Sequence, residues 1–253
     1  MTTDPPNSPS GAATVRVFPD STQLSAAAAA AVVQMANAAV QQRGHFDLVL
    51  AGGNTPRQLY EDLASSFAQR MPWAAVRLFW GDERCVPADH PQSNYRMAME
   101  ALISRAPIAA DQILRMPGEV EPPPAGARQY EKTLRRVFDA GQNPFPRFDL
   151  VLLGLGEDGH TASLFPGNPA LRARRRWVVN VVAPSTYATL DRLTLTAPVI
   201  DHARAVFYLV AGANKQSAVQ AALAARPLTT LPTSHIRRPA ITWFLDAPAA
   251  ALL

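Results

Sequence analysis

A glycine-rich segment at residues 154–166, GLGEDGHTASLFP, holds the side chains best suited to acid–base chemistry in this chain. It follows the apolar run LVLL and places Asp158 two residues before His160. At that spacing the carboxylate can orient the imidazole, directly or through the backbone, and a positioned histidine that titrates near neutral pH is the usual general base for activating water. A histidine that only capped the next turn would need neither the carboxylate nor three glycines. We therefore predict that His160 is a general base and that Asp158 is its partner.

A second glycine-containing turn follows the run FDLVLA and reads Gly52-Gly53-Asn54-Thr55-Pro56. Two glycines let the backbone approach a ligand closely, and proline suits the start of a helix whose free N–H groups and dipole favour an anion. These residues can form a phosphate cradle, but a plain tight turn from strand to helix has the same composition. The segment matches neither a Walker loop nor a GxGxxG fingerprint, so it does not indicate nucleotide binding.

Polar residues also follow the apolar run VRLFW, in the segment GDER at 81–84. Asp82 and Arg84 can face a crevice as a charge pair, or they can form a salt bridge that only ties the loop. A little further on, Ser93 and Asn94 precede YRMAMEALI and predict a helix cap with no further role.

Two later cations stand at strand ends. Arg192 opens the run RLTLT, and Lys215 lies in AGANKQSAV, where a strand gives way to a helix. A lysine in the first turn of a helix opposes the helix dipole unless an anion lies nearby. The position of Lys215 therefore suggests a phosphate site.

The elements that must position these residues alternate between short apolar runs and helix-compatible stretches, which predicts a doubly wound α/β fold. Its sheet is expected to be mostly parallel with helices on both faces, and ligands then bind at the carboxyl ends of the strands. Residues 1–13 are expected to form a flexible tail and residues 14–253 a single domain. The expected strands are 14–18, 46–51, 76–80, 148–154, 177–182, 192–196, 205–212 and 241–246. The expected helices are 25–42, 56–69, 95–104, 125–138, 197–202 and 214–225.

Composition narrows the classes of function. The chain has 253 residues, 48% of them hydrophobic and 17% charged, with a net charge of +4. No apolar run approaches the roughly 20 residues needed to cross a bilayer and the N-terminus lacks the pattern of a signal peptide, so a cytoplasmic protein without a membrane partner is expected. The single cysteine, Cys85, is expected to pack as a small apolar residue, and no Cys/His spacing resembles a metal site. The basic run at 172–176 has no interleaved aromatic residues and predicts a solvated surface rather than a nucleic-acid site.

Six segments together resemble the 6-phosphogluconolactonases, within the wider group that includes glucosamine-6-phosphate isomerase/deaminase. The resemblance runs from about residue 15 to the C-terminus, in order and at the expected separations. The segments are LAGGNTPRQLYEDLA, FWGDERCVPADHPQSNY, FDLVLLGLGEDGHTASLFPG, RLTLTAPVI, LVAGANKQSAV and PAITWFLDAPAAALL.

The resemblance implies a role for each matching residue. His160 would be the base, and Asp158 its partner or a substrate ligand. Asp82 and Arg84 would belong to the sugar-binding wall, and Arg84 or a backbone N–H of the glycine loop would stabilise the oxyanion. The substrate phosphate would be bound by Gly52, Gly53, Asn54 and Thr55 and neutralised by Arg192 and Lys215. Lactonases commonly have serine where Asn54 stands, and the family needs no metal or organic cofactor.

One position separates the relatives. Deaminases resemble DGHIAFNEP in this loop, where a glutamate helps to open the sugar ring, whereas Phe165 occupies the corresponding place here and cannot move a proton. The resemblance therefore implies hydrolysis of 6-phospho-D-glucono-1,5-lactone to 6-phospho-D-gluconate by a protein that is a monomer or a weak homo-oligomer. The alternatives are a sugar-phosphate isomerase or deaminase, a catalytically inactive binding protein, and a sugar-phosphate-sensing regulator, for which the short tail leaves no room for a DNA-binding helix pair.

Overall fold

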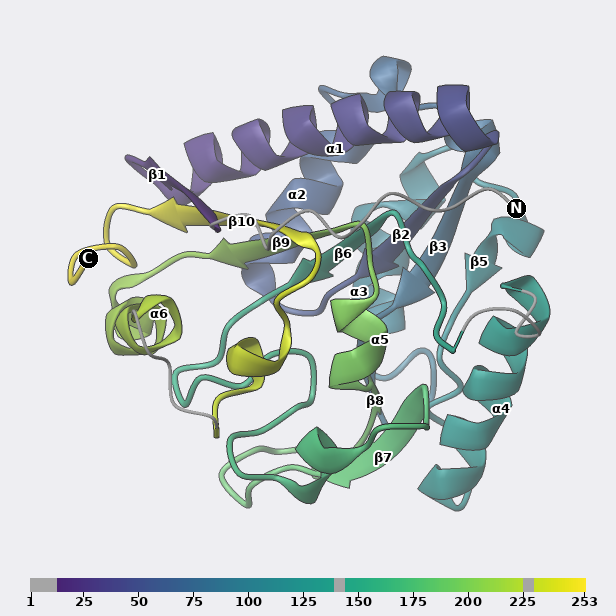
Figure 1. The fold of residues 1–253 in the computed structure, drawn as a ribbon. Coiled ribbons are helices and arrows are strands. Elements are labelled where there is room, and N and C mark those ends of the chain that lie inside the picture. Colours follow the sequence, from purple (N-terminus) through teal and green to yellow (C-terminus); the bar gives the residue numbers. More distant parts are fainter. Residues whose placement is uncertain (1–12, 139–143, 225–229) are drawn as a thin grey trace, which may run out of the picture.

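Seven parallel strands form the central sheet in the computed structural model, which describes residues 13–138, 144–224 and 230–253 (Figure 1). The chain passes from β2 outward to β3 and β5, and then returns to place β6 on the other side of β2. The strand order therefore reverses between β2 and β6, and such a reversal opens a crevice at the carboxyl ends of the strands. Across the sheet the order is β1 (Thr14–Phe18), β10 (Ala240–Asp246), β9 (Ala205–Val210), β6 (Leu150–Leu153), β2 (Phe46–Leu50), β3 (Val76–Trp80) and β5 (Ile113–Leu114).

The inner strands are mostly apolar because both faces of the sheet are covered. Every residue of β2, β6 and β9 is buried. A strand buried on both faces shows a continuous apolar run rather than an alternating pattern, which is why these strands were visible in the sequence. The predicted α/β fold with a mostly parallel sheet is confirmed.

A second sheet corrects the prediction at two of the expected strands. The runs at 177–182 and 192–196 lie outside the central sheet, as β7 (Val178–Val182) and β8 (Asp191–Leu195). They pair antiparallel with each other, and β8 pairs antiparallel with β4 (Asp82–Arg84), a strand in the segment expected to be a turn. The connection from β7 to β8 is too short for the crossover that parallel neighbours require, so the two strands form a hairpin.

Each of the six predicted helices corresponds to a helix in the structure, with bounds that differ by up to a turn or so. In Figure 1, α1 lies across one side of the sheet, whereas α5 and the small sheet lie on the other side. The helices are α1 (Ser21–Arg43), α2 (Asn54–Ala64), α3 (Asn94–Ala101), α4 (Pro123–Val137), α5 (Ala197–Asp201) and α6 (Gln216–Leu223). Short 3₁₀ turns are η1 (Ala68–Arg70), η2 (Trp73–Ala75), η3 (Ile103–Arg105), η4 (Ala110–Gln112), η5 (Pro169–Arg172), η6 (Ala213–Lys215) and η7 (Pro232–His235).

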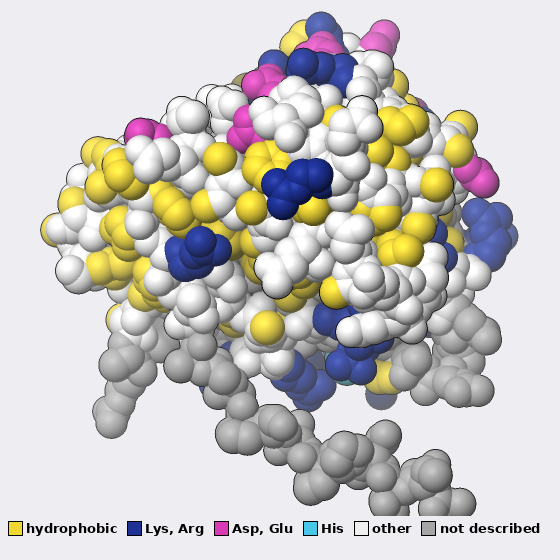
Figure 2. All heavy atoms as spheres, turned by 90° about the horizontal axis from the view of Figure 1, so that it is seen from above, with side chains coloured by type: hydrophobic (Ala, Val, Ile, Leu, Met, Phe, Trp, Pro, Cys, Tyr) yellow, Lys and Arg dark blue, Asp and Glu magenta, His cyan; other side chains and the backbone are white. Residues whose placement is uncertain are grey.

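Helix α1 overturns the expectation that no segment is long and apolar enough to cross a membrane, because its length and composition suffice. In this fold, however, one stripe of the helix packs against α2, β2 and β10, and 44% of its most apolar window is buried. The buried residues recur every three or four positions, as in a helix that covers a core. Figure 2 shows the side of the molecule on which α1 lies, where isolated cationic side chains stand among hydrophobic and uncharged ones.

Some expectations lie wholly or partly outside the described residues. These are the flexible tail, apart from Ala13, and the last residue of the helix expected at 214–225. Cys85 is a free, half-buried cysteine packed against the core, as expected.

Candidate active site

Most of the predicted site residues line two adjoining cavities at the carboxyl ends of the central strands. The first, of about 260 Å³, is lined by Gly52, Gly53, Asp82, Arg84, His160, Arg192 and Lys215, among others. The second, of about 370 Å³, is lined by Asn54 and Thr55. Lys215 and the two glycines border both cavities, whereas Arg192 lines only the first and Asp158 lines neither. The expected phosphate ligands are thus divided between two neighbouring spaces.

The carboxylate of Asp158 orients the imidazole of His160. Its Oδ1 lies 2.6 Å from Nδ1 of His160 and also accepts the backbone N–H of His160 at 3.0 Å. Partial burial acts to raise the pKa of Asp158, but the hydrogen bonds from His160 outweigh it and hold the pKa at about 2. An ionised carboxylate can only accept, so Nδ1 carries the hydrogen and Nε2 keeps a free lone pair. The Asp158 contact therefore leaves Nε2 as the ring nitrogen of His160 that can act in the first cavity.

Tyr187, in the connection between β7 and β8, completes this cluster. Its hydroxyl donates to Oδ2 of Asp158 at 3.3 Å and lies 3.2 Å from Nδ1 of His160. Burial and the Asp158 carboxylate raise the pKa of the Tyr187 phenol, so it remains protonated and available as a donor. The ring of Phe165 lies 4.8 Å from the imidazole and 5.5 Å from the Tyr187 ring. The imidazole is thus enclosed by one carboxylate and two aromatic rings.

The loop after β6 can hold this pair because of its glycine at 156. A Cβ on Gly156 would overlap Nδ1 of His160 and would lie 2.6 Å from Oδ1 of Asp158. The N–H of Gly156 donates to the carbonyl of His160 at 2.8 Å, which closes the turn. The absence of a side chain at this position therefore lets the backbone approach the base.

Two arginines meet across the small sheet. Arg84 on β4 and Arg192 on β8 are register partners, and Arg192 is 5% exposed. Burial, and then the positive charge of Arg84, lower the pKa of Arg192 from its usual value. Within the described part of the chain, neither guanidinium forms an ion pair with a carboxylate, and Nε of Arg84 is buried without a hydrogen-bond partner. Two neighbouring guanidinium groups without an ion-pair partner among the described residues favour an anionic or oxyanionic ligand.

Asp82 does not pair with Arg84, which overturns both interpretations of these two residues as a charge pair. Its Oδ2 accepts the hydroxyl of the buried Ser163 at 2.6 Å, and its Oδ1 accepts the side-chain amide of Asn94 at 3.2 Å. Arg84 instead donates to the backbone carbonyl of Gln92 at 2.6 Å. Residues two apart in a strand lie on the same face, but here each of the two side chains is already engaged by other partners.

Asn94 has contacts that were not expected from its position at the start of a helix. Ser93 caps α3 by accepting the N–H of Arg96, as expected. The side chain of Asn94 is 2% exposed, lines the first cavity and fills the space where a Cβ on Gly52 would stand. The glycine turn and β4 are therefore joined through one amide side chain.

Helix α2 also stabilises the glycine turn after β2, through hydrogen bonds of Tyr60. The hydroxyl of the buried Tyr60 accepts the N–H of Ala51 and donates to its carbonyl, both at 2.8 Å. Gly53, at φ 99°, then starts α2, so the first turn of that helix faces the second cavity. A helix N-terminus in this position favours an anion.

Lys215 comes from the turn after β9. The N–H of Gly212 donates to both carboxylate oxygens of Asp246 at 3.0 Å, and the side chain of Asn214 donates to Glu157 at 2.5 Å. These bonds anchor the turn to β10 and to the loop that carries His160. In the described residues the ammonium of Lys215 has no ion-pair partner, although it borders both cavities.

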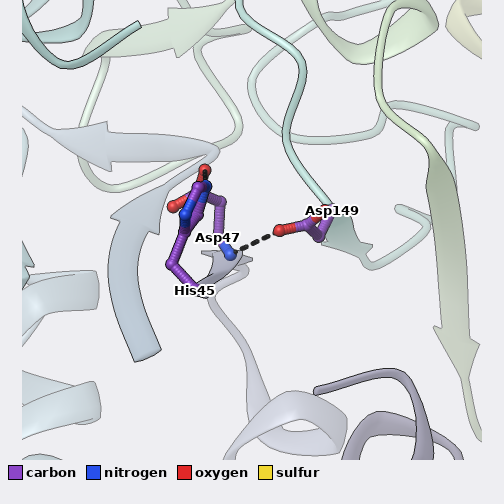
Figure 3. A group of neighbouring side chains, drawn as sticks. All are labelled: His45, Asp47 and Asp149. Atoms are coloured by element: carbon purple, nitrogen blue, oxygen red, sulfur yellow. Dashed lines mark hydrogen bonds and ion pairs between the residues drawn. The ribbon is translucent and has the colours of Figure 1, made fainter. Parts of the chain in front are cut away.

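One group among the described residues has metal-ligand atoms within 4.8 Å of one another, namely His45, Asp47 and Asp149 (Figure 3). It lies at the amino ends of β2 and β6, away from the two cavities. The N–H of Asp47 donates to Asp149, which ties the two strands together. The carboxylates are already paired, Asp47 with Arg77 and Asp149 with Arg43 and Arg204. With three guanidinium groups so close, this cluster is better suited to strand pairing than to a cation.

Sequence reasoning missed three residues of the site. Tyr187 lies in a Pro/Ser/Thr-rich connection that showed no signal beyond one aromatic residue. Asn94 was hidden by its helix-start context, and Ser163 by a loop rich in small residues. All three act through contacts between segments far apart in the chain, which no local pattern encodes.

Comparisons with known proteins identify the family of this chain. The family model described as "Glucosamine-6-phosphate isomerases/6-phosphogluconolactonase" matches residues 19–243. A 6-phosphogluconolactonase of a Nostoc species is 40% identical over 95% of this chain and 98% of its own length, and one of Mycobacterium bovis is 38% identical over 94% and 98%. The solved 6-phosphogluconolactonase from Trypanosoma cruzi superposes with a TM-score of 0.84 at 32% identity, over 95% of this chain and 97% of that one. The chain therefore belongs to the family of glucosamine-6-phosphate isomerases and 6-phosphogluconolactonases.

Proposed function

We propose that this protein hydrolyses 6-phospho-D-glucono-1,5-lactone to 6-phospho-D-gluconate. The observation that carries the proposal is the imidazole of His160, fixed by an ionised Asp158, in a cavity that also holds Arg84, Arg192 and Lys215, none of which has a carboxylate partner among the described residues. A base beside several free cations suits an ester that carries a phosphate. The names of the relatives support the same substrate.

In the first step, Nε2 of His160 takes a proton from a water molecule as its oxygen attacks C1 of the lactone. The tetrahedral intermediate carries a negative charge on the former carbonyl oxygen. Arg84, whose Nε has no hydrogen-bond partner among the described residues, is the proposed donor to that oxyanion. The intermediate then collapses by breaking the bond between C1 and the ring oxygen, which receives the proton from His160. The products are a carboxylic acid, which ionises, and a free hydroxyl.

The phosphate is the proposed anchor of the substrate. Lys215 and the first turn of α2, with Gly53, Asn54 and Thr55, border the same space. Arg192 supplies positive charge from the side of the base. Binding energy from a remote phosphate can position the reacting carbon, which lowers the barrier without further chemistry.

Phe165 favours hydrolysis over sugar isomerisation or deamination. Its ring is 3% exposed and packs against His160 and Tyr187, where a hydrocarbon cannot exchange a proton with a substrate. We further propose that residues 14–253 act as a single cytoplasmic domain, as a monomer or weak homo-oligomer, without a metal or organic cofactor and without a nucleic-acid or membrane partner.

The test is consumption of freshly generated lactone, compared with its spontaneous hydrolysis. Wild-type protein should accelerate the loss of lactone, and His160→Ala should reduce kcat by about 10²–10⁴-fold, the usual contribution of a general base. Release of ammonia from glucosamine 6-phosphate, with no effect on the lactone, would instead identify a deaminase. Binding of the lactone without turnover would identify a non-catalytic binding protein.

A further inference from the structure

A separate cavity of about 310 Å³ lies at the amino ends of the central strands, at the opposite edge of the sheet from His160. His202 lies just before β9 and Arg238 just before β10, and Phe145 precedes β6. Because these strands are parallel, their amino-terminal ends lie together on one side of the molecule, called here the amino edge. Among the described residues, none lines both this cavity and the two at the carboxyl edge. The charged and aromatic residues of this amino-edge cavity are Phe145, Arg174, Asp201, His202, His235 and Arg238.

Positive charge prevails in the amino-edge cavity. Its acid, Asp201, is already engaged, since Oδ1 accepts the N–H groups of Arg237 and Arg238 at 2.6 and 3.0 Å and Oδ2 lies 3.3 Å from Nε of Arg238. Arg174 donates to the backbone carbonyl of Leu171 at 2.7 Å, and in the described residues it has no carboxylate partner. The two guanidinium groups thus outnumber the one carboxylate, whose oxygens are already engaged.

The pKa of His202 is affected by this positive charge. Burial, and then the positive charge of Arg238, lower its pKa, with Asp201 opposing and Arg147 adding to the effect. Its ring packs at 5.5 Å from the ring of Phe145, which supplies an apolar wall. An anion between His202 and the guanidinium groups would reverse the repulsion and stabilise the imidazolium.

We propose that the amino-edge cavity binds a small phosphorylated metabolite, whose phosphoryl group lies between Arg174, Arg238 and His202. Guanidinium groups match the oxygens of a phosphoryl group in geometry and charge, and a histidine can donate to a third oxygen. The volume lies at the lower end of the roughly 300–1,000 Å³ typical of small-molecule sites, which suits a compact metabolite. This site stands on its own residues and does not depend on the lactone reaction.

The experiment follows the imidazole C–H resonances of the full-length protein by NMR as pH is varied. His202→Gln assigns the His202 resonance by its loss. Inorganic phosphate should raise the pKa of His202 by about half a unit or more relative to chloride at equal ionic strength, because a dianion favours the charged imidazole. Acetate at the same ionic strength should have a much smaller effect, which separates phosphoryl recognition from general screening.

Matched variants locate the effect. Arg174→Gln and Arg238→Gln, tested singly, should each reduce the phosphate-induced shift of His202, whereas Lys132→Gln, which removes an exposed cation of α4, should retain it. Lys215→Gln should also retain it, because Lys215 lies at the other edge of the sheet. The proposal is wrong if phosphate leaves the His202 titration unchanged in the wild type, if acetate shifts it equally, or if the shift survives in both arginine variants.

Discussion

Oδ1 of Asp158 accepts two hydrogen bonds from one residue, the ring Nδ1–H and the backbone N–H of His160, at 2.6 and 3.0 Å. Two bonds to one oxygen fix both the ring and the turn that carries it. The tautomer follows, because the ionised carboxylate cannot donate and Nδ1 must therefore hold the hydrogen. The proposed base is then Nε2 of His160.

Asp158→Asn should lower kcat for lactone hydrolysis by about 10²–10⁴-fold with little change in KM. An asparagine side chain can donate to Nδ1 and so favours the wrong tautomer, an effect of this size being known for a catalytic aspartate–histidine pair. The measurement is kcat and KM from lactone consumption, with unchanged circular dichroism as the control. A raised KM with normal kcat would show instead that Asp158 is a substrate ligand.

Lowering the pH should remove the stabilisation of the folded state that Asp158 provides. Its folded-state pKa of about 2 lies below the unfolded value, so its stabilisation is present above about pH 4 and is lost as pH falls toward 2. The free energy of unfolding of the wild type should therefore exceed that of Asp158→Asn near neutral pH, and the difference should shrink over this window. Denaturant titrations of both proteins at several pH values measure it, and a difference that does not vary with pH would contradict the assignment.

Gly156→Ala should reduce kcat at least tenfold while the protein remains folded. The added methyl would displace the imidazole and its carboxylate, and misplacement of a catalytic group by about 1 Å can cost 10²-fold. Gly81→Ala is the matched control, because its Cβ would meet Leu50 O at 3.5 Å and a Val49 methyl at 3.6 Å, which are ordinary contacts. Equal activity in the two variants would show that His160 does not depend on the space at Gly156.

Lys215→Ala should raise KM for the phosphorylated lactone by roughly 10- to 100-fold, as expected for loss of one charge-assisted hydrogen bond of about 1.5–3 kcal/mol. Hydrolysis of unphosphorylated gluconolactone should change little in the same variant. Lys132→Ala controls for loss of net charge, since Lys132 is the other lysine of the chain and is exposed on α4. A KM that is unchanged for both lactones would place the phosphate elsewhere.

Tyr60→Phe should destabilise the protein by about 1–3 kcal/mol, because it leaves the buried N–H and carbonyl of Ala51 without the hydroxyl that satisfies them. The glycine turn rests on the same backbone, so KM should rise as well. Urea unfolding gives the first quantity and lactone kinetics the second. Wild-type values for both would mean that the hydroxyl does not support the turn.

The sequence predicted the parts of this structure that depend on local pattern. Mostly apolar runs indicated the buried parallel strands, and the turns after them pointed to Gly52, His160 and Lys215 at the carboxyl ends of the strands. The pairing of Arg84 with Arg192 could not be predicted in this way. It depends on β4, three polar residues that become a strand only because β8, over one hundred residues later, supplies its hydrogen-bond partner.

The same limit applies to the contacts around His160. Asp158 and His160 are two residues apart, so their pairing was accessible from spacing. Tyr187 reaches them from the β7–β8 connection, and its place depends on a hairpin that was expected to be part of the central sheet. Because the pairing of β7 with β8 was not predicted, the contact of Tyr187 with the site was missed, even though the fold class was correct.

The order of the central strands also bears on how the chain is made. Within the described residues, β1 bonds to β10 alone, so the first strand of the central sheet to be synthesised pairs with the last strand of that sheet. Until β10 has been synthesised, the strand that holds Val15 and Val17 has no partner among the described strands and can pair with other chains. Pairing of two strands so far apart in the sequence also slows folding. Co-translational folding of this protein should accordingly build the sheet outward from its middle, with the N-terminal edge added at the end.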